Sequence, residues 1–280
     1  MTASRRLLTY SAAIVALLFG ATAAGAWIGP SPEKSKSEAP APIGHGVVTA
    51  EKRYRLVPET TRLALGGGTF RFHIEGRDGR PVRSFELVHE KRLHLVVVNR
   101  ELTEFHHLHP KLAADGRWSV DLPGMPPGSY RAITDFWVHD GPRLALGVDL
   151  AIAGTYRPGA LPPPSATTAV DGYTVSVNPD ADDRGNVTIA LTVSRGGVVV
   201  TDLQPYLGAS GHLIGIHSGD LAYAHVHPNG YEDGIVTFDA ELPREGRYGM
   251  FFDFKHHGVV RTASFTFDQG LVSGDTTMGH

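Results

Sequence analysis

Apolar residues occur in short segments along this chain of 280 residues, and most of these segments suit strands. Residues 69–75 alternate apolar and polar side chains, as a half-buried strand does. Residues 93–98 form a β-branched apolar run, and no long stretch beyond the N-terminus shows helical periodicity. The predicted strands are residues 69–75, 93–98, 118–122, 130–138 and 144–152, then 173–177, 187–193, 212–217, 222–227, 235–242, 248–254 and 259–267.

The density of these segments predicts the fold class. About seven short strands per 100 residues, with turns between them, are typical of immunoglobulin-like or cupredoxin-like sandwiches. The 33 glycines and 19 prolines suit many such turns. Tyr130 and Tyr248 each follow a Gly-containing corner and resemble the structural tyrosine corner of these sandwiches. We therefore predict an all-β chain with two tandem β-sandwich domains after an N-terminal transmembrane or signal helix.

The chain repeats itself at a fixed offset of 118 residues. Residues 94–110 lie over residues 212–228, and the register continues without a gap to residues 139 and 257. The aligned 46 positions hold 13 identities, which are mainly His, Asp, Gly, Pro and aromatic residues. A repeat of this length predicts two copies of one structural module.

Composition between and around the copies predicts the domain boundaries. Residues 155–169 contain a proline triplet without apolar periodicity, so they are expected to be a linker. The expected sequence of parts is a membrane anchor or signal peptide at 1–28, a flexible spacer at 29–54, module 1 at 55–154, the linker at 155–169, module 2 at 170–269 and a disordered tail at 270–280.

The N-terminus has the pattern of a targeting or anchoring segment. Arg5 and Arg6 precede an apolar run that ends near Ile28 and is about long enough to span a bilayer. The run also resembles a signal peptide with a cleavage site near Ala26. Either interpretation exports the rest of the chain. We expect an extracytoplasmic protein anchored to the plasma membrane, or alternatively a cleaved and secreted one.

Composition also limits the chemistry. The chain has no cysteine, which excludes disulfides, thiolate nucleophiles and the blue-copper site built from two histidines and a cysteine. A net charge of −3 indicates no basic face for nucleic acid. Histidine is abundant, with 15 residues, and the repeat places several of them at matched positions.

The spacing of the matched histidines predicts metal binding. His107 and His109 are two residues apart on one strand, so their side chains share a face. A two-residue turn at residues 100–101 would place His94 directly opposite His107. A turn at residues 218–219 predicts the same hairpin for the second copy. Its three histidines are His212, His225 and His227.

Two further matched pairs are candidates for completing the sites. His139 and His257 follow a later strand and can supply a fourth nitrogen. Asp135 and Asp253 can ligate the ion or accept the second ring N–H of a ligand histidine. Imidazoles without thiolates suit Zn(II) or Cu(II), so we expect about one such ion per module.

Other interpretations of these residues remain open. The hairpin histidines can form a solvated polar stripe or a pH-responsive cluster. The later histidines can be ordinary loop residues, and the aspartates can brace strand ends. The histidines without a matched partner are not expected to be ligands, and they include His73, His89, His106, His217 and His256.

The chain resembles exported, actinobacterial-type heavy-metal-binding proteins with two cupredoxin-like or immunoglobulin-like modules. The segments HLVVVNRELTEFHHLHP, TDLQPYLGASGHLIGIHSGDLAYAHVHP and DFKHHGVVRTASF carry the resemblance. It covers most of the chain beyond the spacer. The resemblance implies copper handling by association and implies no enzymatic activity.

We therefore expect an extracytoplasmic metal-binding protein, acting as a carrier, buffer or sensor for copper or zinc. Its partners would be the metal ion and another exported metal-handling protein, with the membrane contacted through the N-terminal segment. A zinc metalloenzyme with three histidine ligands is less favoured, because no matched glutamate accompanies the cluster as a general base. A cell-surface interaction or adhesion module without metal is the other alternative.

Overall fold

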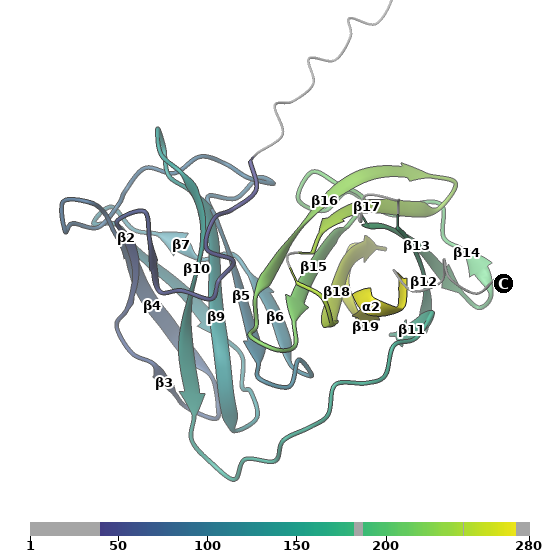
Figure 1. Ribbon diagram of the computed structural model, residues 1–280, viewed down its shortest axis with the longest axis horizontal. Helices are drawn as coiled ribbons and strands as arrows, with labels where there is room; N and C mark the ends of the chain where they lie inside the picture. Colours follow the sequence, from purple (N-terminus) through teal and green to yellow (C-terminus); the bar gives the residue numbers. More distant parts are fainter. Residues whose placement is uncertain (1–39, 182–186, 243, 273–280) are drawn as a thin grey trace, which may run out of the picture. The chain divides into compact units, whose positions relative to one another are not determined.

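The computed structural model describes residues 40–181, 187–242 and 244–272 (Figure 1). Within these residues the secondary structure consists of strands, apart from the short helix α2 (Gln269–Val272). This confirms the all-β prediction. Each predicted strand segment coincides with an observed strand, although β12 (Tyr173–Ala181) and β16 (Tyr223–Glu232) extend past their predicted ends. The predicted N-terminal helix at 1–28 lies outside the described residues. The disordered tail predicted at 270–280 begins too early, because residues 270–272 belong to α2, and the rest of it, from 273, lies outside the described residues. The described residues contain no helix with the length and apolar character that crossing a membrane requires.

The first module consists of strands β1 to β10, which form two five-stranded sheets. The β4 sheet has the order β1-β2-β4-β8-β7, and the β9 sheet has the order β3-β10-β9-β5-β6. The bounds are β1 Ala50–Glu51, β2 Tyr54–Pro58, β3 Arg62–Leu63, β4 Gly68–Glu75, β5 Leu93–Asn99, β6 Phe105–Leu108, β7 Lys111–Leu112, β8 Arg117–Leu122, β9 Gly128–Trp137 and β10 Arg143–Ile152. Apolar side chains from both sheets, among them Phe72, Trp118 and Phe136, form one buried core. The module is thus a β-sandwich.

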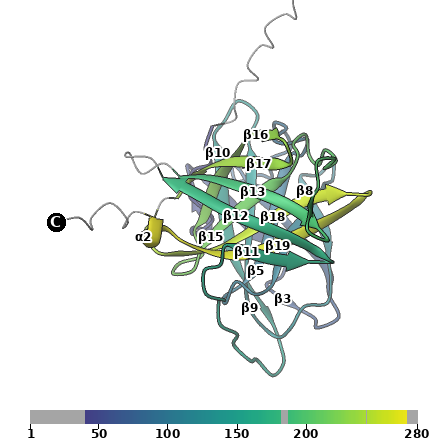
Figure 2. The same ribbon diagram turned by 90° about the vertical axis from the view of Figure 1, so that its right-hand side faces the viewer.

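The second module consists of strands β11 to β19, and its β13 sheet is seen in Figure 2 with β12, β13 and β17 side by side. The nine strands form one continuous sheet in the order β11-β12-β13-β17-β16-β15-β18-β19, with β14 on β13. Strand β16 joins its two halves, which are the β13 sheet (β11-β12-β13-β17-β16) and the β18 sheet (β16-β15-β18-β19). The bounds not yet given are β11 Thr167–Val170, β13 Val187–Arg195, β14 Val198–Val199, β15 His212–His217, β17 Ile235–Glu241, β18 Arg247–His256 and β19 Val259–Asp268. A second core, which includes Tyr173, Phe238 and Phe252, lies between the two sheets.

One strand differs between the copies. In the first module, β6 pairs with β5 and β7 pairs with β8, and Pro110 lies between β6 and β7. In the second module, β16 passes through the equivalent Pro228 and pairs with β15 at its start and with β17 thereafter. The ladder accommodates this proline with a register shift between Pro228 and Gly230, because proline has no N–H to donate.

The two predicted tyrosine corners are present. The hydroxyl of Tyr130 donates to the carbonyl oxygen of Pro126 at 2.8 Å, and that of Tyr248 donates to the carbonyl oxygen of Arg244 at 2.7 Å. Each tyrosine thereby ties the corner to the strand it enters, four residues downstream. This contact has the structural role that the sequence predicts for both tyrosines.

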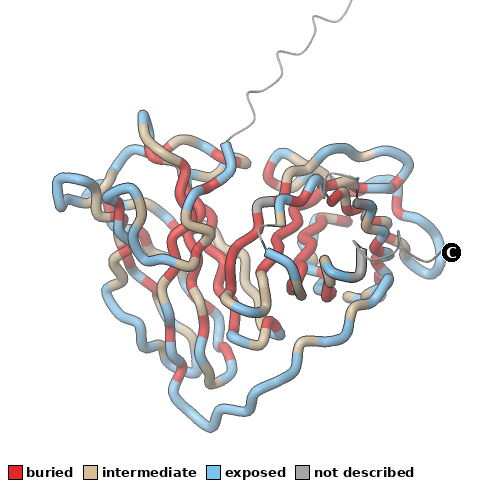
Figure 3. Tube along the Cα trace, in the orientation of Figure 1, coloured by how far each residue is buried: buried red, intermediate tan, exposed pale blue. Residues whose placement is uncertain are grey.

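The outer faces of the β9 and β18 sheets share a third apolar cluster. Val96 and Val98 of β5 and Ile214 and Ile216 of β15 are among its buried members. At its edge, the rings of Phe105 and Phe251 stack with centroids 3.9 Å apart. Figure 3 shows buried residues along the strands of both modules. The two sandwiches therefore bury part of their outer faces against each other.

The segment expected to be a flexible spacer is partly structured. Ile43 forms a parallel bridge with Leu144, and the N–H of Gly46 donates to the carbonyl oxygen of Ala145. A Cβ atom on Gly147 would lie 1.9 Å from the carbonyl oxygen of Gly46, so only glycine fits there. β1 and the start of β2 also fall before residue 55. The spacer prediction therefore extends too far, because its polar composition concealed backbone hydrogen bonds to β10.

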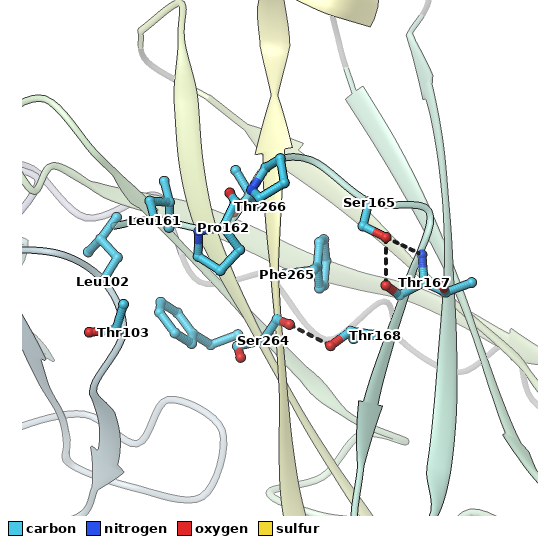
Figure 4. Close-up of a pocket in the computed structure, with 12 residues that line it drawn as sticks. Leu102, Thr103, Leu161, Pro162, Ser165, Thr167, Thr168, Ser264, Phe265 and Thr266 are labelled. Carbon is cyan, nitrogen blue, oxygen red and sulfur yellow. Dashed lines mark hydrogen bonds between the residues drawn. The ribbon is translucent and has the colours of Figure 1, made fainter. Parts of the chain in front are cut away.

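The linker between the modules is anchored to the second module. The hydroxyl of Thr266 donates to the carbonyl oxygen of Pro162 at 2.7 Å, and Leu161 packs against the third cluster. A pocket of about 310 Å³ lies at this place. Figure 4 shows the apolar and hydroxyl side chains that line it, which include Leu102 and Phe265. None of the residues that line it is charged or a histidine. The pocket thus gives no indication of the chemistry of a ligand.

Candidate metal site at the histidine hairpin

Three of the predicted ligands converge in the first module. One nitrogen from each of His94, His107 and His109 lies within 4.8 Å of the others. Their ring centroids are 5.3 Å apart for the first pair and 5.0 Å and 4.9 Å for the two pairs that include His109. Nitrogens about 2.0–2.1 Å from one tetrahedral zinc ion are about 3.4 Å apart, so small side-chain movements bring this set onto one ion. It is the only such group found among the described residues.

The predicted hairpin register is wrong by two residues, and the face is nevertheless right. Val96, rather than His94, pairs with His107. Continuing this ladder places His94 opposite His109. Because side chains alternate with a period of two, a shift of two residues leaves all three histidines on one face.

A wider turn causes the shift. Asn99 accepts the N–H groups of Thr103 and Glu104 on its Oδ1, at 2.8 Å and 2.9 Å, and Leu102 adopts a φ of 59°. The second copy has the same shift, since Ile216 pairs with Tyr223. A turn that is stabilised by the side chain of its first residue, as this one is by Asn99, is difficult to predict from turn dipeptides alone.

The tautomer of His94 is set by a neighbouring turn. Its Nε2 lies 2.9 Å from the carbonyl oxygen of Val88, which can only accept a hydrogen bond. Val88 and Lys91 flank a two-residue turn in which His89 and Glu90 have φ values of 46° and 65°, as in a type I′ turn. Because Nε2 of His94 must carry its hydrogen, Nδ1 presents a lone pair.

The tautomer of His107 is set by the second module. Its Nδ1 lies 2.8 Å from Oδ2 of Asp253, and both side chains are buried. Oδ1 of this carboxylate accepts the hydroxyl of Thr262 at 2.6 Å. Asp253 therefore accepts the second ring N–H of a candidate ligand, as a carboxylate does in many zinc sites. This role was one of the two expected for Asp253. The expected partner, however, was a histidine of the second module, whereas His107 belongs to the first.

These two constraints direct two ring nitrogens at each other. Nδ1 of His94 and Nε2 of His107 are 3.0 Å apart. With His94 donating from Nε2 and His107 donating from Nδ1, neither facing nitrogen has a hydrogen in the neutral rings. Two lone pairs at that distance repel each other, so the contact requires either a shared proton or a cation between them.

His109 adds a third available nitrogen. Its Nε2 is buried and has no hydrogen-bond partner in the part of the chain that the structure describes. A buried polar atom without a partner costs about 1–3 kcal/mol. Coordination of an ion would remove that cost.

The second copy reproduces the orientation of its first histidine. Nε2 of His212 lies 3.0 Å from the carbonyl oxygen of Tyr206, which is the repeat equivalent of Val88. Tyr206 and Ala209 flank the same kind of turn, with positive φ at Leu207 and Gly208. His212 is opposite Asp253 in the ladder, just as His94 is opposite Asp135. The side chain of the predicted ligand His225 lies outside the described parts.

His89 belongs to this cluster, although its lack of a matched partner predicted otherwise. Its ring lies 4.9 Å from that of His212 and 6.1 Å from that of His94, measured between centroids. Burial lowers the pKa of His89, and the nearby Arg143 and the predicted ligand His227 add to this effect. The repeat equivalent of His89 is Leu207, so matching the copies could not find it. His89 reaches the cluster because it lies in the type I′ turn that follows Val88.

The cluster favours neutral imidazoles. Burial, with a contribution from His107, lowers the pKa of His94 to about 3. Burial likewise lowers the pKa of His109 to about 3 and that of His212 to about 3, with neighbouring histidines adding to the effect. Neutral imidazole is the form that binds metal ions. These rings are therefore ready to act as ligands at neutral pH.

Asp135 has a different role from Asp253. Its two carboxylate oxygens accept hydrogen bonds from Nε and one terminal nitrogen of Arg143, at 3.0 Å and 2.7 Å, and all these groups are buried. The hydroxyl of Tyr223, from the second module, lies 3.4 Å from the same carboxylate. Asp135 thus forms a buried bidentate ion pair beside the cluster, and its oxygens are engaged by arginine.

The predicted fourth ligands are elsewhere. His139 is exposed, and its Nδ1 bonds Glu86, an interaction that raises the pKa of His139. His257 is exposed at a turn, with its ring against that of His256. Within the described part of the chain, neither ring contacts the hairpin histidines. Matching positions in the repeat do not imply a shared site, because β9 and β18 continue past the cluster before these residues.

The fold and this cluster define a two-module, all-β protein with a candidate metal site on the face of one sheet. The chain belongs to the family DUF8832, described as a domain of unknown function, whose model matches residues 51–157 and again residues 168–270. No curated protein sequence matches the chain.

Several solved structures match the chain at low similarity. The bacterial integrin-binding protein invasin is 15% identical with a TM-score of 0.21, and the match covers 76% of this chain and 38% of that one. The BSP domain of a biofilm-associated protein is 13% identical with a TM-score of 0.24 over 77% and 30% of the two chains. Domains 5–6 of the S-layer protein SbsC are 12% identical with a TM-score of 0.23 over 75% and 95%. The match therefore spans about a third of the first two structures.

Proposed function

We propose that this protein binds a transition-metal ion through His94, His107 and His109. The observation that carries the proposal is the pair of facing nitrogens 3.0 Å apart, on His94 and His107. Val88 and Asp253 fix the rings from behind, so the available lone pairs point at a common position. Orienting contacts of this kind are typical of ligand histidines.

The ligand chemistry favours Cu(II) or Zn(II). Three neutral imidazoles without a thiolate suit both ions, and the chain has no cysteine to favour Cu(I). The carboxylate of Asp253 orients a histidine, and that of Asp135 is held by Arg143. We therefore propose a nitrogen-only set of ligands.

The biological role that fits this site is extracytoplasmic metal handling, as a carrier, buffer or sensor. The proposed location derives from the basic and apolar pattern at residues 1–28. An exported protein that delivers or receives the ion would be its partner. A hydrolytic role is not favoured, because the two carboxylates beside the histidines, those of Asp253 and Asp135, already bond His107 and Arg143.

A second candidate is an interaction module that needs no metal. It is favoured by the bond between His107 and Asp253, which joins the two sandwiches directly. In that case a proton shared between His94 and His107 would satisfy the cluster, and the histidines would serve the packing of the modules. The solubility and fold of the protein would then be independent of metal.

Metal content separates the two candidates. The exported region, purified without chelators, should contain bound copper or zinc by elemental analysis. Its His107→Ala/His109→Ala variant should lose the ion at this site, while His139→Ala, which changes an exposed histidine, should not. A wild-type protein without metal, and without a change in melting temperature on adding Cu(II) or Zn(II), would leave only the interaction module.

A further inference from the structure

We infer that the metal site is shared between the two modules, with Asp253 orienting His107 and His212 supplying a fourth nitrogen. The inference rests on the proposed function and goes beyond it, because it replaces a site within one module by a site that needs both. The sequence repeat predicts about one ion in each module. The contacts across the boundary instead favour one joint ion at the hairpin of the first module.

The orientation of His212 matches that of His94. Its Nε2 donates to the carbonyl oxygen of Tyr206, as Nε2 of His94 donates to that of Val88. The same turn geometry therefore leaves Nδ1 of His212 as an available lone pair. Only 7% of each residue, His94 and His212, is exposed to solvent. Both rings are thus held in fixed positions with equivalent nitrogens available.

The two copies also line one small cavity. Its volume is about 20 Å³, and its walls include His94 and His107 from the first module and His212 from the second. A cavity needs roughly 10–15 Å³ to hold one water molecule, so this one has room for a single water or ion. An ion placed there would lie among histidines of both modules.

The ring separations allow a shared ion after a small movement of His212. The centroid of an imidazole lies about 3.2 Å from a coordinated ion, so two ligand rings are about 5.3 Å apart in tetrahedral geometry. The rings of His94 and His107 are 5.3 Å apart, and those of His107 and His212 are 6.5 Å apart. His212 lies outside the three histidines whose nitrogens already converge, so its ring would move about 1 Å toward His107 to join the same tetrahedral ion.

The second module furthermore fixes a ligand of the first. Asp253 lies in β18, and its bond to His107 at 2.8 Å is buried from solvent. Without this carboxylate, His107 would be free to rotate or to change tautomer. Loss of such an orienting partner typically lowers metal affinity 10–100-fold. The first module on its own therefore has His94, His107 and His109 but lacks the carboxylate of Asp253 that orients His107.

The test is a Zn(II) titration of the full exported region by calorimetry, with EDTA-treated protein. We expect His212→Ala and Asp253→Asn each to weaken Zn(II) binding at least tenfold, and wild type to bind one ion at this site. The matched control is His256→Ala. His256 is also in the second module, is 5% exposed and bonds Tyr173 and Asp202 outside the cluster.

X-ray absorption of the Zn(II) complex gives a second measurement that does not depend on affinity. Wild type should show four nitrogen ligands, and His212→Ala should show three, with a light atom from water completing the shell. Near-ultraviolet circular dichroism of each variant in EDTA verifies that the fold is retained. If a variant is unfolded, His212→Phe, which keeps a ring of similar size, replaces it.

The outcomes distinguish this inference from the proposed function. If His107→Ala/His109→Ala binds Zn(II) as wild type does, the proposed function is wrong. If that variant loses binding while His212→Ala and Asp253→Asn both keep wild-type affinity, the site is not shared, and metal binding stands alone. Two equivalent ions per chain, each lost with one module's histidines, would also overturn the shared site.

Discussion

His107 and Asp253 are 146 positions apart in the sequence and are joined by a hydrogen bond of 2.8 Å from Nδ1 to Oδ2. The bond connects the hairpin of the first sandwich to the sheet of the second, and both groups are buried. Orientation of the hairpin histidine and packing of the two modules therefore depend on the same carboxylate.

Asp253→Asn should destabilise the metal-free protein. The substitution replaces a charged acceptor of His107 and Thr262 by a neutral one whose NH2 group has no acceptor in the same place. Hydrogen bonds to charged groups contribute about 1.5–3 kcal/mol, so we expect a loss of that order in the free energy of unfolding. Urea denaturation in EDTA measures it. A loss below about 0.5 kcal/mol would contradict a structural role for the bond.

The metal-free protein should lose stability between pH 7 and pH 5. The folded-state pKa values of His94, His109 and His212 are each lowered to about 3, whereas unfolded histidine titrates near 6.5. Between these values the unfolded chain binds more protons, so the free energy of unfolding falls as the pH falls. Each fully shifted histidine contributes up to about 2 kcal/mol over this interval.

Melting temperatures across that pH range, measured in EDTA, examine this dependence. The variant His94→Gln removes one of the three groups and should have a shallower slope. A slope that is unchanged in the variant, or stability that rises on acidification, would show that burial of these rings is not what determines the pH dependence.

Binding of Zn(II) should release at most about one proton per ion near pH 7. The low pKa values leave His94, His109 and His212 neutral before the ion arrives. The contact between Nδ1 of His94 and Nε2 of His107 has room for at most one proton, which the ion would displace. Calorimetry in buffers of different ionisation enthalpy counts the protons, and release of two or more would contradict neutral ligands.

Phe251→Ala should weaken the contact between the modules. The ring of Phe251 is 2% exposed and stacks on Phe105 across the boundary, beside Val98 and Ile214. Truncation of a buried phenylalanine costs about 3–5 kcal/mol. We also expect weaker Zn(II) binding than in wild type, because the groups from the second module would be held less firmly. Val260→Ala, at an exposed position, is the control.

Tyr130→Phe and Tyr248→Phe should lower stability by about 1 kcal/mol each without changing the affinity for Zn(II). Each substitution removes one hydroxyl that donates to a carbonyl oxygen four residues upstream. Chemical denaturation measures the first effect and calorimetry the second. A change in metal affinity would contradict the purely structural role of the corners.

Much of the fold follows from the sequence because its signals are local. Alternation and β-branched runs locate the strands, and the offset of 118 residues indicates two sandwiches. The face shared by His94, His107 and His109 was also predictable, because it depends on parity alone. The register between β5 and β6 was not predictable, because the side chain of Asn99 bonds the backbone of the turn and makes the turn longer than two residues.

The composition of the site depends on contacts that no local pattern carries. His89 enters the cluster from a turn whose counterpart in the second copy holds Leu207. Asp135 and Asp253 occupy equivalent positions, yet one pairs with Arg143 and the other with His107. Sequence comparison of the copies treats them as equal, whereas the packing of one copy on the other gives them different partners.

The position of Asp253 in β18 also bears on the order in which the protein is assembled. A chain emerging from its N-terminal end completes the hairpin of His94 and His107 well before β18 is synthesised. The partner of His107 arrives only when the last strands have folded and docked. The hairpin would thus reach its final ring orientations late, and the proposed capture of an ion would wait until the last strands of the second module are in place.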